Sequence, residues 1–243
     1  MHAMKLFAET RNIIGSILFN IFFWTYFMII VVVLIPLYCV FSYKTMRIIA
    51  YRSTAKAMHV LLRIFLGVKY KVTGLENITG QCIIGANHQS MWETLAIPDA
   101  ISGTKDISVV VKKELGDTLL FGIHMKNLRN IAIDRSKPVF ALKTLLSCGS
   151  EAKNSGDSIL IFVTGTRTQE QGGSGHKVGV YALYKNLGLP VVPCQIDSGK
   201  CWGKQSFFKR CGTIHANFMK PIQPGLSREE FDEVMSKSFS DIR

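Results

Sequence analysis

Residues 82–101, CIIGANHQSMWETLAIPDAI, join a strand to a helix through a short polar loop. The run Cys82–Ala86 is short, apolar and free of charge, which is typical of a strand buried on both faces of a sheet. A helical pattern of apolar residues covers Met91–Ile101. The stretch therefore predicts one strand–loop–helix unit, whose loop presents His88 at the end of the strand.

The same alternation continues along the chain. Helical patterns lie at Met91–Ile101, Lys137–Asn154 and Val178–Leu187, and the capping box Ser227-x-x-Glu230 predicts a short C-terminal helix. Strands that alternate with helices indicate an α/β fold with a largely parallel sheet flanked by helices. Seven runs rich in β-branched and apolar residues predict the strands: Val68–Thr73, Cys82–Ala86, Ile107–Val111, Asn130–Asp134, Ser158–Val163, Pro190–Ile196 and Thr213–Phe218.

The N-terminal part of the chain is strongly apolar. No charged residue lies between Arg11 and Lys44, and Ile17–Val40 is dense in Phe, Ile, Val and Leu. A membrane-spanning helix needs about 20 apolar residues, whereas a cleavable signal peptide has an apolar core of only about 7–15. We expect a membrane anchor, either one long tilted helix or a helical hairpin broken at Pro36. A buried core helix of a soluble protein is the alternative.

Basic residues follow the apolar run and predict its orientation. Under the positive-inside rule, this side of the anchor faces the cytoplasm. The stretch Thr45–Leu66 mixes basic and apolar residues, which favours a basic amphipathic helix on an anionic leaflet over an ordinary packing helix. We expect residues 1–66 to form the anchor and this helix, and residues 67–243 to form the α/β domain. The basic residues concerned are Lys44, Arg47, Arg52, Lys56 and Arg63.

Charge and cysteine usage narrow the class of protein. The chain of 243 residues carries a net charge of +12, of which residues 1–66 contribute +6. The excess beside the apolar run favours an anionic membrane surface over nucleic acid, and the α/β part shows no basic helix with interleaved aromatic residues. The six cysteines contain no C-x-x-C pair, which indicates reduced thiols facing the cytosol.

His88 and Glu93 are the candidate catalytic pair. Five residues along a continuous helix would turn the two side chains about 140° apart, so contact requires His88 in the loop and Glu93 in the first helical turn. The predicted elements supply that arrangement. A carboxylate so placed can fix the histidine tautomer and stabilise the imidazolium. Because Ser90-x-x-Glu93 is also a capping box, helix capping is the alternative role for Glu93.

Asn87-His88-Gln89-Ser90 with Glu93 resembles the N-H-x-S-x-x-D/E signature of the 1-acyl-sn-glycerol-3-phosphate acyltransferase family, also called lysophosphatidic acid acyltransferases, in its bacterial form. Further blocks resemble the family in the same order, and together they span residues 82–195. They are Lys112-Lys113-Glu114-Leu115, Ile133-Asp134-Arg135, Phe162–Arg167, Lys177-Val178-Gly179 and Leu189–Pro193. The chain departs from the family where Val163 and Thr164 replace the usual Pro and Glu.

The resemblance implies transfer of a fatty acyl group from an acyl thioester to the free sn-2 hydroxyl of 1-acyl-sn-glycerol 3-phosphate, giving phosphatidic acid in phospholipid biosynthesis. His88 would act as general base, oriented by Glu93. The hydroxyl would attack directly without an acyl-enzyme, and the sequence has no G-x-S-x-G elbow. Acyl-coenzyme A or acyl carrier protein would be the donor, with no cofactor and no metal. The implied location is the bacterial inner (cytoplasmic) membrane, with the site facing the cytoplasm.

An anionic substrate phosphate needs charge-assisted hydrogen-bond donors. For each lysine that the resemblance implies, a solvated surface charge is the alternative. The residues implied by the family match are Arg135 and Arg167, then Lys113 and Lys177, with the backbone at Gly165 and Thr166.

Two other functions stay open at this point. One is an acyltransferase for another acceptor, such as glycerol 3-phosphate or a lyso-aminolipid, since a His–acid pair serves any hydroxyl. The other is a non-catalytic membrane lipid-binding homologue, which Thr164 favours because the family's carboxylate is missing there.

Overall fold

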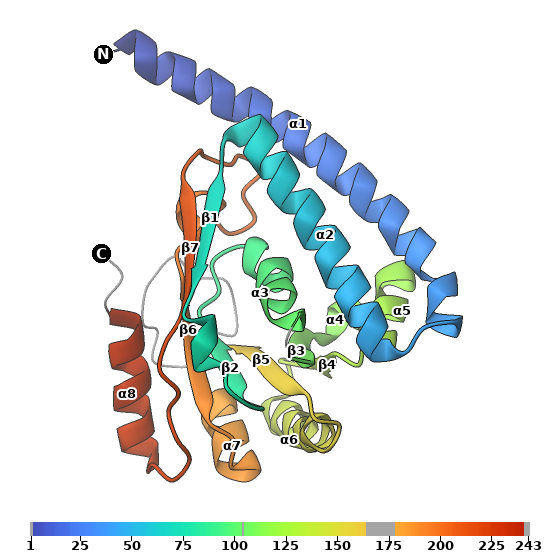
Figure 1. Cartoon of the computed structure of the whole chain (residues 1–243), viewed down its shortest axis with the longest axis vertical. Helices are drawn as coiled ribbons and strands as arrows, with labels where there is room; N and C mark the ends of the chain where they lie inside the picture. The colour runs from blue at the N-terminus through green and yellow to red at the C-terminus, as the bar shows by residue number, and fades with distance from the viewer. Residues whose placement is uncertain (1, 104, 164–177, 241–243) are drawn as a thin grey trace.

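The computed structural model describes residues 2–103, 105–163 and 178–240 (Figure 1). The described residues form a seven-stranded sheet in the order β1-β7-β6-β2-β5-β3-β4. Every predicted strand is confirmed to within one residue at each end. The bounds are β1 (Lys69–Thr73), β2 (Ile83–Ala86), β3 (Ile107–Lys112), β4 (Ile131–Ile133), β5 (Ser158–Phe162), β6 (Val191–Ile196) and β7 (Thr213–Phe218).

The sheet is largely parallel, as predicted. Strands β6, β2, β5, β3 and β4 pair in parallel along the sheet. Strand β7 is antiparallel to β6, and β1 is parallel to β7, so β1 and β7 run opposite to the other five. The carboxyl ends of parallel strands meet at one edge of a sheet, where α/β proteins bind their ligands. The loop after β2, which carries His88, lies at this edge.

Helices cover both faces of the sheet. The predicted helices are present as α3 (Trp92–Ser102), α6 (Pro138–Asn154), α7 (Val178–Leu187) and α8 (Arg228–Ser240), while α4 (Lys113–Gly116) and α5 (Leu119–Asn127) were not predicted. Alternate strand residues divide between two cores. Ile84 and Leu160 face the core shared with α3, whereas Ile83 and Ile159 face the core shared with α6, α7 and α8. This alternation is the period-2 pattern of a sheet buried on both faces.

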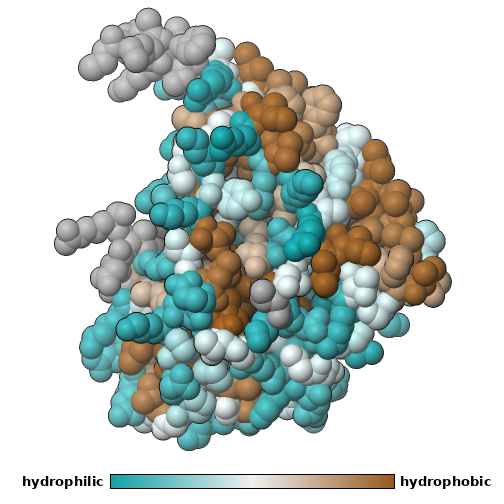
Figure 2. All heavy atoms as spheres, viewed as in Figure 1, coloured by the Kyte–Doolittle hydropathy of each residue, from teal (hydrophilic) through white to brown (hydrophobic). Residues whose placement is uncertain are grey.

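The apolar N-terminal run is one continuous helix, α1 (His2–Leu34). A 3-10 turn at Pro36–Cys39 follows, and α2 (Tyr43–Leu66) folds back along α1 (Figure 1). By length and composition, 9–39 can cross a membrane, and only 28% of its most apolar window is buried. Figure 2 shows the resulting apolar surface along α1. The sequence left open one long helix or a hairpin broken at Pro36. In the structure the apolar run forms the one long helix, and a turn begins at Pro36.

A buried lysine fastens α1 to the loop before β7. The Lys209 backbone N–H donates to Ser16 Oγ at 2.8 Å, and its Nζ donates to Asn20 Oδ1 at 2.6 Å. The same Nζ lies 4.8 Å from the centroid of the Trp202 ring. Burial lowers the pKa of Lys209 to about 8, because the ammonium loses hydration. Polar residues on one face of an apolar helix thus dock it on the α/β unit across the predicted domain boundary.

The prediction for Arg47 is wrong. The sequence places Arg47 among the basic residues that face the membrane surface, but in the structure it is buried, with 1% of its surface exposed. Its guanidinium donates to Asp157 Oδ2 at 2.6 Å, to Ser108 Oγ at 2.8 Å and to the Leu128 carbonyl at 2.7 Å. An arginine can be buried when its charge is paired and its N–H groups are satisfied. Around Arg47, α2 is therefore a packing helix that ties the N-terminal hairpin to the sheet.

We predict that Arg47→Ala lowers the free energy of unfolding by about 3–5 kcal/mol, because Asp157 is left buried without its partner. Lys44→Ala is the matched control on the same helix. It removes an ion pair to Asp106 in which the lysine is 42% exposed, so it should cost about 1 kcal/mol or less. Urea unfolding in detergent measures both variants. Equal losses would contradict the assignment of Arg47 as the principal tie.

His59 on α2 is a half-buried residue in the same layer. Its ring stacks on Tyr70 with centroids 3.8 Å apart and lies beside Trp92. Among the described residues its Nε2 is buried without a hydrogen-bond partner. Burial lowers the pKa of His59 from 6.5 to about 4, because the charged imidazolium is poorly solvated there.

The lowered pKa of His59 predicts a loss of stability at acidic pH. Below about pH 6.5 the unfolded chain binds a proton at this residue that the folded chain refuses until about pH 4, so stability falls across this window. His59→Phe should therefore lose less stability than the wild type between pH 7 and pH 4. The measurement is the difference in unfolding midpoint between the two proteins at several pH values. A difference in unfolding midpoint that does not change with pH would refute the lowered pKa of His59 as the cause of the acid sensitivity.

Candidate active site

Asn87 fixes the start of the loop that carries His88. Its side-chain N–H donates to the Ile196 carbonyl at 2.7 Å, and its Oδ1 accepts from the Ile196 N–H at 2.7 Å. This paired bond joins the carboxyl ends of β2 and β6, which are neighbours in the sheet. From the sequence, Asn87 is recognisable only as part of a motif, because its partner Ile196 lies 109 residues away.

His88 and Glu93 lie in contact, as predicted. His88 Nδ1 is 2.9 Å from Glu93 Oε1; Glu93 is fully buried and the His88 side chain is 12% exposed. An ionised carboxylate only accepts, so Nδ1 carries the hydrogen and Nε2 keeps its lone pair. No described residue is hydrogen-bonded to Nε2. The ring is thus held in the tautomer that a general base requires.

Several donors surround the Glu93 carboxylate besides His88. Oε1 accepts from the backbone N–H groups of Gln89 and Ser90, both at 2.6 Å. Oε2 accepts from Ser198 Oγ at 2.6 Å and from Ser90 Oγ at 3.1 Å. Burial alone raises the pKa of Glu93, but the hydrogen bonds from His88, Ser198 and Ser90 and the charge of His88 outweigh it, so the pKa lies below its ordinary value. Glu93 is therefore a carboxylate at neutral pH.

The two roles considered for Glu93 occur together. Its bond to the Ser90 N–H is one half of a capping box. Ser90 Oγ accepts from the Trp92 N–H at 2.8 Å, and the N-cap of α3 is Met91. The same carboxylate also reaches His88. Capping fixes Glu93 in the first turn of α3, and this position brings it to the histidine.

Phe162 packs against the face of the His88 imidazole ring. The rings of Phe162 and His88 are stacked with centroids 4.1 Å apart and an interplanar angle of 19°. Phe162 is the last residue of β5, the neighbour of β2. Its role was not inferred from the sequence, where it appeared only as the first residue of a motif block.

The other predicted site residues are only partly described. Lys113 and Arg135 lie at the same sheet edge, just beyond the paired residues Lys112 and Ile133 of β3 and β4. At about 4.8 Å per strand, they are two and three strands from β2, roughly 10 and 14 Å sideways. Burial lowers the pKa of Arg135, although Glu114 opposes this shift. Outside the described residues lie Gly165, Thr166, Arg167 and Lys177, together with Thr164.

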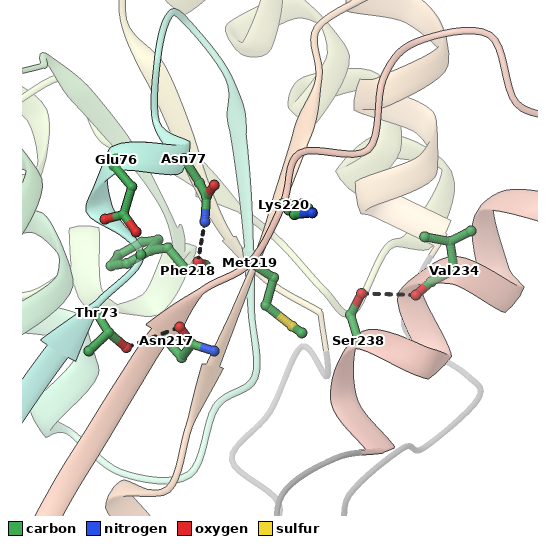
Figure 3. Close-up of a pocket in the computed structure, with 10 residues that line it drawn as sticks. Thr73, Glu76, Asn77, Asn217, Phe218, Met219, Lys220, Val234 and Ser238 are labelled. Atoms are coloured by element: carbon green, nitrogen blue, oxygen red, sulfur yellow. Dashed lines mark hydrogen bonds between the residues drawn. The ribbon is translucent and has the colours of Figure 1, made fainter.

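A hollow of about 550 Å³ lies away from the His88 loop, between the ends of β1 and β7 and helix α8 (Figure 3). Several of its polar side chains are hydrogen-bonded to neighbours. Thr73 Oγ1 is bonded to Asn217 Oδ1 at 3.0 Å, and Ser238 Oγ donates to the Val234 carbonyl at 2.9 Å. We assign no chemistry to this hollow. In the described ranges no group of three His, Cys, Asp or Glu side chains is arranged to hold a metal ion.

Known proteins resemble this chain in sequence. The model of a family described as Acyltransferase matches residues 69–197. A 1-acyl-sn-glycerol-3-phosphate acyltransferase of Pseudomonas aeruginosa is 40% identical over 155 residues, covering 63% of this chain and 59% of that protein. One from Saccharomyces cerevisiae is 27% identical over 190 residues, covering 76% and 62%. The matches thus span about three fifths of these relatives.

A solved structure has the same fold. The 1-acyl-sn-glycerophosphate (LPA) acyltransferase of Thermotoga maritima superposes with a TM-score of 0.73, covering 96% of this chain and 94% of that one. Sequence identity over this match is 19%. The likeness extends over the N-terminal helices as well as the sheet.

We predict that Glu93→Ala lowers the free energy of unfolding by about 2–5 kcal/mol, because the donors from Gln89, Ser90 and Ser198 are left buried without an acceptor. His88→Ala removes one hydrogen bond at the edge of the site and should cost about 1 kcal/mol. Thermal unfolding in detergent compares the two. The account of Glu93 fails if its variant is as stable as the His88 variant.

Proposed function

Because this chain belongs to the Acyltransferase family, we propose that it transfers a fatty acyl group from an acyl thioester to the sn-2 hydroxyl of 1-acyl-sn-glycerol 3-phosphate. The product is phosphatidic acid, a precursor in phospholipid biosynthesis. The observation that carries the proposal is the His88–Glu93 contact, which directs the lone pair of His88 Nε2 away from the carboxylate. The names of the P. aeruginosa and S. cerevisiae relatives support the choice of acceptor.

In the proposed reaction His88 Nε2 takes the proton of the sn-2 hydroxyl as its oxygen attacks the thioester carbonyl. The carbon–oxygen bond forms, the tetrahedral intermediate collapses, and the carbon–sulfur bond breaks. The leaving thiolate takes the proton back from the imidazolium. Glu93 stays ionised throughout and stabilises the imidazolium, as its lowered pKa favours. Attack is direct, and no acyl-enzyme forms.

The proposed acceptor carries a phosphate, and the sheet edge beside His88 carries cations. Lys113 and Arg135 are there in the described part of the chain. An arginine partly withdrawn from water binds phosphate more strongly than one in bulk solvent, because the surroundings screen its charge less. Arg167, Lys177 and the backbone of Gly165 and Thr166 are proposed to complete the phosphate site. The donor is proposed to be acyl-coenzyme A or acyl carrier protein.

We also propose that the exposed apolar face of α1 lies in the bacterial inner membrane, with the site on the cytoplasmic side. Ile21, Met28, Ile29 and Val32 are among the apolar side chains of α1 that are more than half exposed. A water-soluble enzyme would have to extract each acyl chain from the bilayer, at about 0.8 kcal/mol per CH₂. An enzyme held at the surface meets the acceptor where it resides.

A non-catalytic lipid-binding protein is the second candidate, and Thr164 is the residue that favours it. Against it stands the buried Glu93, which keeps its charge and its contact with His88. A protein that only binds lipid has no use for a histidine held in one tautomer. Acceptors other than 1-acyl-sn-glycerol 3-phosphate, such as glycerol 3-phosphate or a lyso-aminolipid, would use the same dyad.

We predict that membranes carrying the protein transfer labelled acyl groups to lysophosphatidic acid, and that His88→Ala lowers the rate at least about 10³-fold. The assay uses acyl-coenzyme A and acyl carrier protein in separate arms, which identifies the donor. Thr164→Glu should match or exceed the wild-type rate, because it restores the family's carboxylate.

The control for folding is that the His88 variant keeps the wild-type membrane content and unfolds at a temperature no more than about 2–4 °C lower, as a loss of about 1 kcal/mol implies. Acyl transfer that persists in His88→Ala would refute the role of His88 as general base. An inactive wild type that becomes active as Thr164→Glu would point to the lipid-binding alternative, and activity with glycerol 3-phosphate alone would change the acceptor.

A further inference from the structure

The turn that follows β6 contacts both sides of the His88 loop. Ser198 is fully buried, and its hydroxyl donates to Glu93 Oε2 at 2.6 Å. The next residue, Gly199, donates its backbone N–H to Gln89 Oε1 at 3.0 Å. Two consecutive residues of this turn are therefore bonded to Glu93, the partner of His88, and to Gln89, its neighbour in the chain.

The turn is itself fixed from β7. Asp197 is buried, and its Oδ1 accepts from the His215 backbone N–H at 2.6 Å. Its Oδ2 lies 3.0 Å from His215 Nδ1 and 3.3 Å from Lys200 Nζ. The Ser198 carbonyl accepts from the Trp202 N–H at 2.8 Å. Because these contacts involve neither α3 nor the loop of His88, the turn is a support independent of them.

Gly199 permits the close approach of this turn. A Cβ at position 199 would lie 3.0 Å from Gln89 Oε1 and 3.2 Å from Gln89 Cβ. Such distances are tighter than ordinary van der Waals contact, so a side chain there would make the Gln89 side chain shift by a few tenths of an ångström. The absence of a side chain at residue 199 thus favours the close contact.

We propose that Ser198 is a positioning residue that acts through Glu93 on His88, supported by the turn 197–200. This inference rests on the proposed function for its kinetic consequence. The hydroxyl of Ser90, which also donates to this carboxylate, is a weaker support, because Ser90 Oγ lies 3.1 Å from Oε2 and also accepts from the Trp92 N–H. Ser198 therefore holds Oε2, and together with the backbone donors on Oε1 it sets the plane of the carboxylate that faces His88.

Ser198→Ala should lower kcat by about 10-fold or more and leave KM for lysophosphatidic acid within about 2-fold, since only the geometry of the base changes. Ser198→Cys keeps a donor, although a weaker one on a larger atom, and its kcat should fall between those of the wild type and Ser198→Ala. Ser102→Ala removes a buried hydroxyl at the other end of α3 and should change neither constant. Unchanged kcat in Ser198→Ala would overturn the proposal.

The route through Glu93 is tested by combining variants. In a Glu93→Gln background, Ser198→Ala should lower kcat by less than about 2-fold, because the group that Ser198 positions has already lost its charge. The same fold-loss in both backgrounds would show that Ser198 acts by another route.

A spectroscopic readout separates this inference from the proposed function. In protein labelled with ¹⁵N-histidine, the Nδ1–H resonance of His88 is assigned by its loss in His88→Ala. It should shift in Ser198→Ala and Gly199→Ala and not in Ser102→Ala. If the wild type transfers no acyl group, the proposed function fails while this resonance still decides the inference. A resonance that does not move in Ser198→Ala overturns it.

Discussion

The buried carboxylate of Glu93 is the group on which the geometry of the site depends. A charge without solvent is tolerated only when its lone pairs are filled by donors. Here the donors come from the loop after β2 and from the turn after β6, while Glu93 itself lies in the first turn of α3. Satisfying one carboxylate therefore fixes three segments relative to each other and sets the direction of His88.

Buried polar groups also hold the apolar N-terminal helices to this framework. Arg47 ties α2 to β3 and β5 through Ser108 and Asp157, and Lys209 ties α1 to the loop before β7 through Asn20. With these contacts, one side of α1 packs against the protein and the other side is apolar and exposed. A surface that can enter lipid is thus fixed to the sheet whose carboxyl edge carries His88. For an enzyme with a lipid acceptor, this arrangement keeps the site beside its substrate.

Local sequence patterns predicted the strands, the main helices and the His88–Glu93 pair, because each is determined within a few neighbouring residues. The spacing of five residues made the dyad a candidate once a loop and a helix were placed around it, and the resemblance to the family decided between catalysis and helix capping. Partners distant in the sequence were not predictable in this way. Ser198 lies 105 residues from Glu93, and Asp157 lies 110 from Arg47. Helical periodicity indicates which face of α2 is buried, but not that a charge on that face finds a partner.

The most direct test of the account is a structure of the protein with lysophosphatidic acid bound. The account predicts that the sn-2 hydroxyl oxygen lies about 2.6–3.2 Å from His88 Nε2, with Nδ1 still on Glu93. The acceptor phosphate should then lie toward Arg135 at the same sheet edge. A hydroxyl bound beyond reach of Nε2, with the dyad intact, would contradict the role of His88 as general base.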